Sequence, residues 1–212
     1  MDVLVAGGHG KVALRLLRLL AEGGHEARGL IRNPDHAADL EAVGAHPIVA
    51  DLEGDDDIGP QVRGADAVVF AAGAGPGSGP ERKRTVDLGA AVKLADAAKL
   101  QGVDRYVIVS SIGAHAPDVD SPMRAYLQAK AEADDYLRSS GLDWTIVRPG
   151  SLTDEPGTGR VTVSTELGGR GAVTRDDVAA VLLATLGAPN TIGVTFELFA
   201  GDTPIAEAVR SL

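Results

Sequence analysis

The sequence has 212 residues, with 20 Lys and Arg against 30 Asp and Glu, which gives a formal net charge of −10. This length predicts one domain, and the acidic balance argues against a nucleic-acid-binding protein, because phosphate binding needs a concentrated basic surface. Hydrophobic residues make up 44% of the chain, enough for a globular core. Cysteine is absent, which excludes disulfides, thiolate metal sites and cysteine nucleophiles and fits a reducing compartment.

Residues 1–8 carry no basic leader, and their apolar run is too short for a secretory signal. No stretch approaches the ~20 apolar residues of a membrane span. We therefore expect a soluble cytoplasmic protein that acts on a small-molecule substrate, with neither a membrane nor a nucleic acid as partner. The sequence leaves the oligomeric state open.

Short apolar runs without polar alternation predict buried strands, and amphipathic stretches between them predict helices. The predicted strands cover residues 3–6, 27–31, 47–50, 67–72, 105–111 and 144–147. The predicted helices cover residues 11–22, 37–43, 82–101 and 122–139, with Asp35 as the candidate N-cap of the second. This alternation indicates an α/β fold, a Rossmann-type doubly wound parallel sheet with helices on both faces.

After Pro149 this rhythm breaks. Residues 151–171 are rich in Gly and Thr and are predicted to be mostly loop, with a short strand at 160–164. A helix at 175–186, a strand at 194–199 and a short helix at 204–210 follow. We expect one domain in which residues 1–150 form the cofactor-binding core and residues 151–212 a small substrate-side extension.

A glycine loop follows the first predicted strand, with Gly7, Gly10 and Ala13 in a G-x-x-G-x-x-A pattern. The first glycine allows a tight turn, the second allows backbone to approach a pyrophosphate at the helix N-terminus, and the small third residue allows close packing. A plain structural turn is the alternative. A Walker A loop is excluded, because Val12 follows Gly10-Lys11 where Ser or Thr is needed. His9 could contact a cofactor phosphate or lie in solvent.

The second predicted strand ends in Arg32, where NAD-binding proteins carry a carboxylate for the ribose hydroxyls. A guanidinium suits a 2′-phosphate, so the sequence favours NADP over NAD, with a solvated strand-end charge as the alternative. Asp51 and Leu52 follow the third strand and are candidates to meet the adenine amine; a plain turn carboxylate is the other interpretation of Asp51.

Tyr126 and Lys130 lie four residues apart in a predicted helix and therefore on one face. A Lys ammonium lowers the pKa of a nearby phenol and can bind a ribose, and such a phenol can transfer the proton that accompanies hydride transfer. Ser110 and Ser111 end the fifth strand, at the sheet edge where ligands bind, and either could hydrogen-bond a substrate carbonyl. An exposed helical pair is the alternative for Tyr126 and Lys130.

The sequence resembles the short-chain dehydrogenase/reductase superfamily, in particular its atypical subgroup of small NAD(P)H-binding proteins, which includes NmrA-like proteins and biliverdin-IXβ/flavin reductases. The matching segments occur in family order over about residues 1–150, and residues 173–179 (VTRDDVA) also match. The segments are VLVAGGHGKVA, LIRNP, ADL, FAAGAG, YVIVSS, YLQAK and TIVRPG.

The resemblance implies a role for each matching position. It assigns the phosphate loop to Gly7, Gly10 and Lys11, and the binding of the 2′-phosphate to Arg32. It places Ala72 and Gly73 beside the adenosine ribose, and Pro149 and Gly150 beside the nicotinamide. It assigns the catalytic set to Ser110 or Ser111 with Tyr126 and Lys130. Asp87 stands where many relatives carry an Asn in the proton-relay helix.

The five histidines show no metal-ligand spacing, and no G-x-S-x-G elbow is present. The acidic run at residues 53–57 is interpreted as a solvated loop, and residues 73–80 as a flexible loop over the cofactor. The leading interpretation is an NADP-dependent reductase of a small carbonyl, quinone or flavin-like acceptor. A non-catalytic NADP-binding regulator is the alternative. A nucleotide-sugar epimerase or dehydratase comes third, because it normally needs a larger substrate domain.

Overall fold

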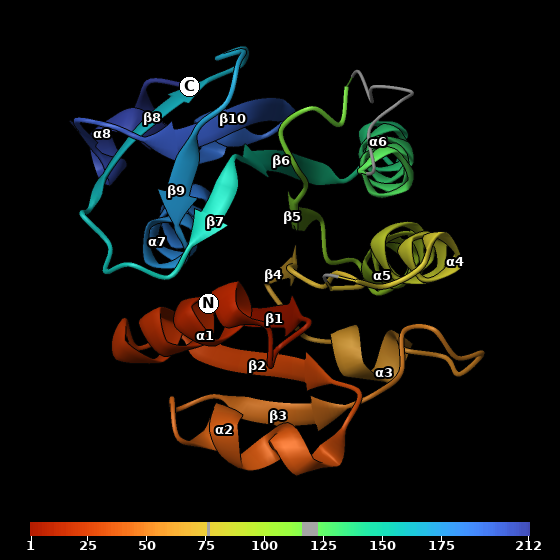
Figure 1. Cartoon of the computed structure of the whole chain (residues 1–212). Helices are drawn as coiled ribbons and strands as arrows, with labels where there is room; N and C mark the ends of the chain where they lie inside the picture. The colour runs from red at the N-terminus through yellow and green to blue at the C-terminus, as the bar shows by residue number, and fades with distance from the viewer. Residues whose placement is uncertain (76, 116–122) are drawn as a thin grey trace.

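The computed structural model describes residues 1–75, 77–115 and 123–212. Its centre is a nine-stranded sheet in the order β11-β8-β10-β6-β5-β4-β1-β2-β3, and β7 pairs with β9 in a second sheet (Figure 1). The strands are Asp2–Ala6 (β1), Glu26–Ile31 (β2), His46–Val49 (β3), Ala67–Phe70 (β4), Arg105–Val109 (β5), Asp143–Pro149 (β6), Ser151–Thr153 (β7), Arg160–Ser164 (β8), Ala172–Thr174 (β9), Val194–Ala200 (β10) and Thr203–Pro204 (β11).

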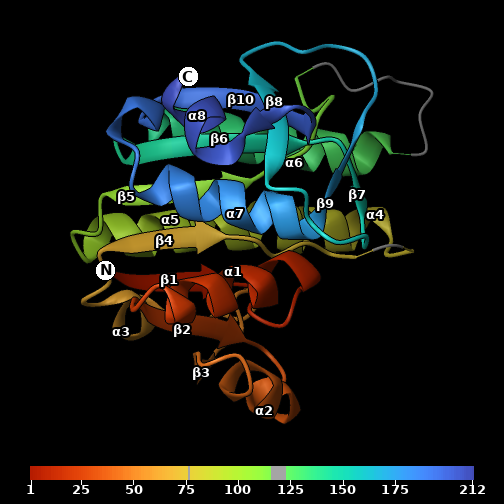
Figure 2. The same cartoon turned by 90° about the vertical axis from the view of Figure 1, so that its left-hand side faces the viewer.

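Helices cover both faces of the large sheet. In Figure 2, α1 and α7 lie in front of the strands and α5 and α6 behind them. The helices are Lys11–Glu22 (α1), Pro34–His36 (η1), Ala37–Glu41 (α2), Gly59–Val62 (α3), Pro80–Arg82 (α4), Lys83–Ala90 (η2), Ala91–Leu100 (α5), Arg124–Ser139 (α6), Arg175–Leu186 (α7), Pro189–Thr191 (η3) and Ile205–Arg210 (α8).

The seven strands from β3 to β10 run parallel, and β8 joins β10 antiparallel. This order, with the chain crossing from β3 to the far side of β1, is the Rossmann pattern and confirms the expected fold. The residues after Pro149 extend the same sheet through β10, β8 and β11.

The apolar strands contribute side chains to two hydrophobic cores, one on each side of the sheet. In β1, Val3 and Val5 pack into the core beneath α1, α7 and α8, whereas Leu4 and Ala6 pack into the core beneath α3, α5 and α6. Successive strand residues point to opposite faces, so a strand covered on both sides must be apolar throughout. That requirement is why the strands read as continuous apolar runs.

Several details differ from the sequence-based expectation, and the short elements α3, β9 and β11 were not predicted. The predicted helix at 82–101 is interrupted, because residues Lys83–Ala90 form a π-helix. The side chain of Asn33, not Asp35, caps the turn before α2, accepting a hydrogen bond from the Asp35 N–H at 3.1 Å. The predicted 151–171 loop contains the additional strand β7. The first residue of the predicted 122–139 helix lies outside the described residues.

Within the described ranges, no helix is both long and apolar enough to cross a membrane.

Candidate cofactor-binding and catalytic site

A pocket of about 330 Å³ lies at the carboxyl ends of β1, β2, β3 and β4, where ligands bind in sheets of this topology. Eight of the residues proposed from the sequence to bind cofactor line it. They are Gly7, His9, Gly10, Arg32, Asp51, Leu52, Ala72 and Gly73. These residues come from four separate loops, and the parallel sheet brings them together because all four loops leave the same edge.

The glycine loop closes one end of this pocket. Gly7 has φ +77°, and a Cβ there would lie 2.6 Å from the Ala72 Cα, so no side chain fits. The Gly10 N–H donates to the Gly7 carbonyl at 2.7 Å, and Gly10 is the N-cap residue of α1, so the helix begins without a side-chain cap. The first N–H groups of α1 are therefore available to an anion, which fits the pyrophosphate of a dinucleotide.

Glu53 lies between two arginines at the rim of the pocket. Its Oε2 is 2.7 Å from Arg32 Nη1 and 3.1 Å from Arg82 Nη2, and its Oε1 accepts a 2.6 Å hydrogen bond from the Thr85 hydroxyl. The interpretation of the acidic run as a solvated loop is therefore wrong for Glu53, whose side chain is only 21% exposed. Asp51 Oδ1 accepts the Glu53 N–H at 2.9 Å and fixes this turn.

His9 is held at the pocket rim by two neighbours. Its ring stacks on His36 with 3.7 Å between centroids, and its Nε2 lies 2.8 Å from Asp39 Oδ2. His36 and Asn33 also line the pocket, and neither was proposed as a cofactor-binding residue from the sequence. Asn33 lies two residues after the end of β2 and His36 ends η1, so their nearness in sequence to Arg32 was the available signal.

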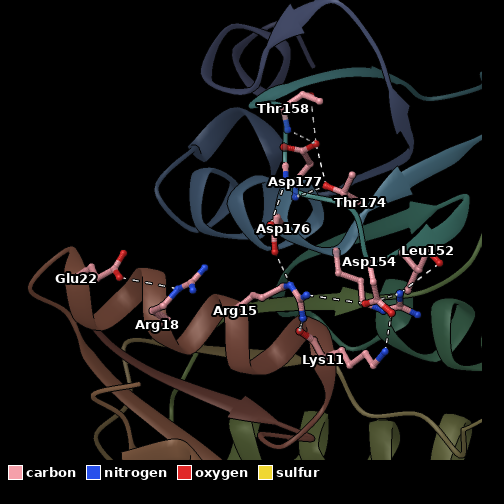
Figure 3. Close-up of polar contacts among 12 residues, drawn as sticks. Lys11, Arg15, Arg18, Glu22, Leu152, Asp154, Thr158, Thr174, Asp176 and Asp177 are labelled. Atoms are coloured by element: carbon pink, nitrogen blue, oxygen red, sulfur yellow. Dashed lines mark hydrogen bonds and ion pairs between the residues drawn. The ribbon is translucent and has the colours of Figure 1, made fainter. Parts of the chain in front are cut away.

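Lys11 does not line the pocket, and its side chain points toward Asp154 in the C-terminal extension (Figure 3). Its Nζ donates to Asp154 Oδ2 at 2.6 Å, and Arg175 Nη1 lies 3.0 Å from the other oxygen. The hydrogen bond from Lys11, assisted by Arg175, holds the pKa of Asp154 below its usual range. Arg15 pairs with Asp176 in the same cluster. Val12 is buried in the core; neither it nor Lys11 lines the pocket.

Lys130 and Asp87 form an ion pair inside the protein. The Lys130 side chain is 3% exposed and that of Asp87 is 0% exposed, with 3.2 Å between Nζ and Oδ1. Lys130 Nζ also donates to the Val109 carbonyl at 3.0 Å. Asp87 Oδ2 accepts a 3.3 Å hydrogen bond from the N–H of Ala74, which follows Gly73 of the pocket wall.

Tyr126 lies beside this pair. Its side chain is half-buried, and its ring centroid is 5.9 Å from Lys130 Nζ and 5.3 Å from Lys83 Nζ. The helical spacing noted in the sequence therefore does place the phenol near an ammonium. Asp87 was noticed only as a departure from the family pattern, since a pairing across 43 positions leaves no local signature.

The two serines at the end of β5 have different surroundings. Ser110 donates to Asp134 Oδ2 at 2.9 Å, and Arg148 donates to the same oxygen from Nε at 3.0 Å and Nη2 at 2.8 Å. Burial raises the pKa of Asp134, and Arg148 opposes that shift. Ser111 is half-buried, and among the residues that the structure describes its hydroxyl donates to the Ile112 carbonyl alone, at 3.2 Å. Of the two, Ser111 is the hydroxyl outside the buried network.

Pro149 and Gly150 are buried where β6 ends. The Pro149 carbonyl accepts the Ile112 N–H at 3.1 Å, and a Cβ on Gly150 would lie 2.3 Å from the Gly171 carbonyl oxygen. Close packing alone therefore requires this glycine. Both residues lie outside the pocket, and their contact with a nicotinamide stays a prediction.

Within residues 1–75, 77–115 and 123–212, no three His, Asp or Glu side chains gather as a metal site would require.

Comparison with known proteins identifies the class. Residues 7–189 match the family described as NAD(P)H-binding. The chain belongs to this NAD(P)H-binding family, of the atypical short-chain dehydrogenase/reductase type, as its fold and glycine loop predict.

Three similar proteins show the range of names within this group. The chain is 40% identical over 215 residues to Uncharacterized sugar epimerase YhfK of Bacillus subtilis, with 100% of each chain covered. A structure from Bacillus halodurans, named provisionally as an NAD-dependent epimerase/dehydratase, has 45% identity and a TM-score of 0.95, with 100% of each chain covered. ChuY, an anaerobilin reductase from Escherichia coli O157:H7, has 25% identity and a TM-score of 0.80, covering 95% of this chain and 98% of that one.

Proposed function

We propose that the protein is an NADP-dependent oxidoreductase that reduces a small carbonyl, quinone or flavin-like acceptor. One observation carries this proposal: the buried pair of Asp87 and Lys130 joins Ala74, the residue after Gly73 of the pocket wall, to the helix that bears Tyr126. A phenol beside an ammonium therefore adjoins the place where a dinucleotide fits. That arrangement suits a proton donor next to a hydride donor.

The bound nicotinamide cofactor supplies the hydride in such a reaction. Tyr126 would donate the proton to the reduced acceptor. Lys130 is held by Asp87 and the Val109 carbonyl, so it would act on Tyr126 through its charge. Ser111 would orient the acceptor, because the hydroxyl of Ser110 is already engaged with Asp134.

The preference for NADP rests on Arg32 at the pocket rim. A guanidinium offers a 2′-phosphate charge-assisted hydrogen bonds that an NAD ribose cannot use as well. The anaerobilin reductase of E. coli, which shares this fold over nearly the whole chain, supports the reductase proposal by its name.

A sugar-nucleotide epimerase is the second candidate, favoured by the names of the B. subtilis and B. halodurans proteins. Those proteins match this chain end to end, so their names apply to chains without a larger substrate domain. An epimerase returns the hydride to its substrate and keeps its cofactor. A regulator that binds NADP without turnover is the third candidate.

The test is NADPH oxidation against a panel of quinones, flavins and aldehydes, together with absorbance of co-purified cofactor. A reductase oxidises NADPH in the presence of one acceptor, and Tyr126→Phe lowers that turnover by about 10²–10⁴ while NADPH affinity barely changes. Tightly retained NAD with no net oxidation would favour the epimerase. NADPH binding without oxidation by any acceptor would favour the regulator. A flavin or quinone that takes its proton from water would leave Tyr126→Phe largely active.

A further inference from the structure

We infer that Arg32 and Arg82 together form a clamp for the 2′-phosphate of NADP, and that Glu53 is an internal competitor which this phosphate replaces. The inference rests on the proposed use of NADP. It adds a second cationic ligand and an opposing carboxylate to the single arginine that the sequence suggests.

The two guanidinium groups converge on one oxygen atom. Arg32 Nη1 and Arg82 Nη2 lie 2.7 Å and 3.1 Å from Glu53 Oε2. Arg32 follows β2 and Arg82 ends α4, so they reach this point from two separate segments of the chain, and all three residues line the pocket. Glu53 Oε2 therefore marks a position where an anionic oxygen receives two guanidinium groups, the geometry that a phosphate oxygen requires.

Glu53 and a phosphate cannot both occupy this position, because their negative charges repel each other. A 2′-phosphate carries a charge close to −2 at neutral pH, which two arginines balance. Adding the Glu53 carboxylate brings a like charge within a few ångströms, and like charges at that distance repel. When the phosphate binds, the Glu53 carboxylate must therefore leave the two arginines. Asp51 holds the Glu53 backbone through the Glu53 N–H, so only the Glu53 side chain has to move.

The side chains have the freedom that this exchange needs. The Arg32 and Arg82 side chains are 55% and 42% exposed, so their guanidinium groups can follow a phosphate. Glu53 would give up its contacts with both arginines and keep the hydrogen bond that its Oε1 accepts from the Thr85 hydroxyl. The energy of the Glu53 contacts is therefore subtracted from phosphate binding, so Glu53 lowers NADPH affinity without altering the chemistry.

The probes are 2′,5′-ADP and 5′-AMP, which differ only in the 2′-phosphate, and the measurement is calorimetric binding. Arg82→Met should weaken 2′,5′-ADP about tenfold to a hundredfold, the usual range for a charge-assisted hydrogen bond. It should leave 5′-AMP unchanged. Arg84→Met is the matched control, since Arg84 lies two residues further along and pairs with Glu132 instead. Glu53→Gln should tighten 2′,5′-ADP by about tenfold, because the competing charge is gone.

The outcomes separate the clamp from the proposed function. If the wild type prefers 2′,5′-ADP but Arg82→Met behaves like Arg84→Met, the clamp is wrong and the use of NADP stands. If Glu53→Gln weakens 5′-AMP and leaves 2′,5′-ADP unchanged, Glu53 binds the ribose hydroxyls and the competitor role is wrong. If the wild type binds both probes equally, NADP preference and clamp fail together. Unfolding curves that match wild type establish that each variant is folded.

Discussion

Replacing Lys130 with Met should lower the free energy of unfolding, whatever role Lys130 has in catalysis. The substitution keeps a similar volume and removes only the ammonium, which lies 3.2 Å from Asp87 and 3.0 Å from the Val109 carbonyl. Asp87 is completely buried, and in this variant it would lose the ammonium with which it forms its ion pair. A simple loss of catalysis in Lys130→Met is therefore not interpretable until its folding has been measured.

The expected cost follows from this burial. Removing one member of a buried ion pair costs about 3–5 kcal/mol, because the remaining charge is uncompensated. Total stabilities of domains are about 5–15 kcal/mol, so the loss is a large share. Asp87→Asn should cost less, about 1–3 kcal/mol, since an amide oxygen can still accept from Lys130.

The assay is urea unfolding followed by circular dichroism, with the double variant Lys130→Met/Asp87→Asn completing a cycle. The double variant buries no charge at this position and should be more stable than Lys130→Met alone. Lys99→Met is the control, because Lys99 is exposed and its loss should change the free energy of unfolding by under about 0.5 kcal/mol. If Lys130→Met and Lys99→Met unfold at the same urea concentration, the reasoning about the buried pair is refuted.

Three further predictions concern the pocket and the cluster in Figure 3. Arg32→Asp should weaken NADPH about tenfold to a hundredfold and NADH much less, as measured by fluorescence titration; equal wild-type affinities for the two would contradict it. Gly10→Val should abolish cofactor binding in protein shown to be folded, because its side chain would crowd the Gly7 carbonyl, 3.0 Å from an added Cβ; unchanged affinity would leave the loop a structural turn only. The hydrogen bond from Arg15 lowers the pKa of Asp176, so its stabilising effect is present above the unfolded pKa of about 3.9 and is lost as the pH falls through the folded value. Asp176→Asn should therefore lower the melting temperature at pH 7 by the effect of an ion pair of up to about 1 kcal/mol and converge with wild type in acid; equal melting temperatures at pH 7 would show that the pair contributes nothing.

The fold was predictable because its signals are local. Each parallel strand is covered on both faces, so it must be an unbroken apolar run such as residues 67–70, and such runs are visible one at a time. The helix at 175–186 has the predicted bounds because Thr174 caps it, accepting from the Asp177 N–H at 3.0 Å. The π-helix at 83–90 was not predictable, because a hydrogen bond that spans one more residue than in an α-helix does not change the residue types that a helix prefers.

The pocket was predictable only where residues follow a strand directly. Gly7, Arg32 and Ala72 each come within two residues of a strand end, and the common sheet edge collects them. Glu53 and Arg82 were missed, because their contact depends on how far a loop and a helix lean toward each other. The sequence also did not predict that Ser110 joins the buried network around Asp134 and Ser111 does not. Adjacent residues point to opposite sides, and the sequence does not show which side is buried.

The position of β10 in the sheet governs how this chain can fold during synthesis. Residues 194–198 pair with residues 145–149 of β6 and bring Phe196 and Leu198 into the core. Until they have left the ribosome, β6 has an unpaired edge, and unpaired apolar edges are prone to bind other strands. We expect this edge of β6 to stay open to pairing with other strands until β10 docks.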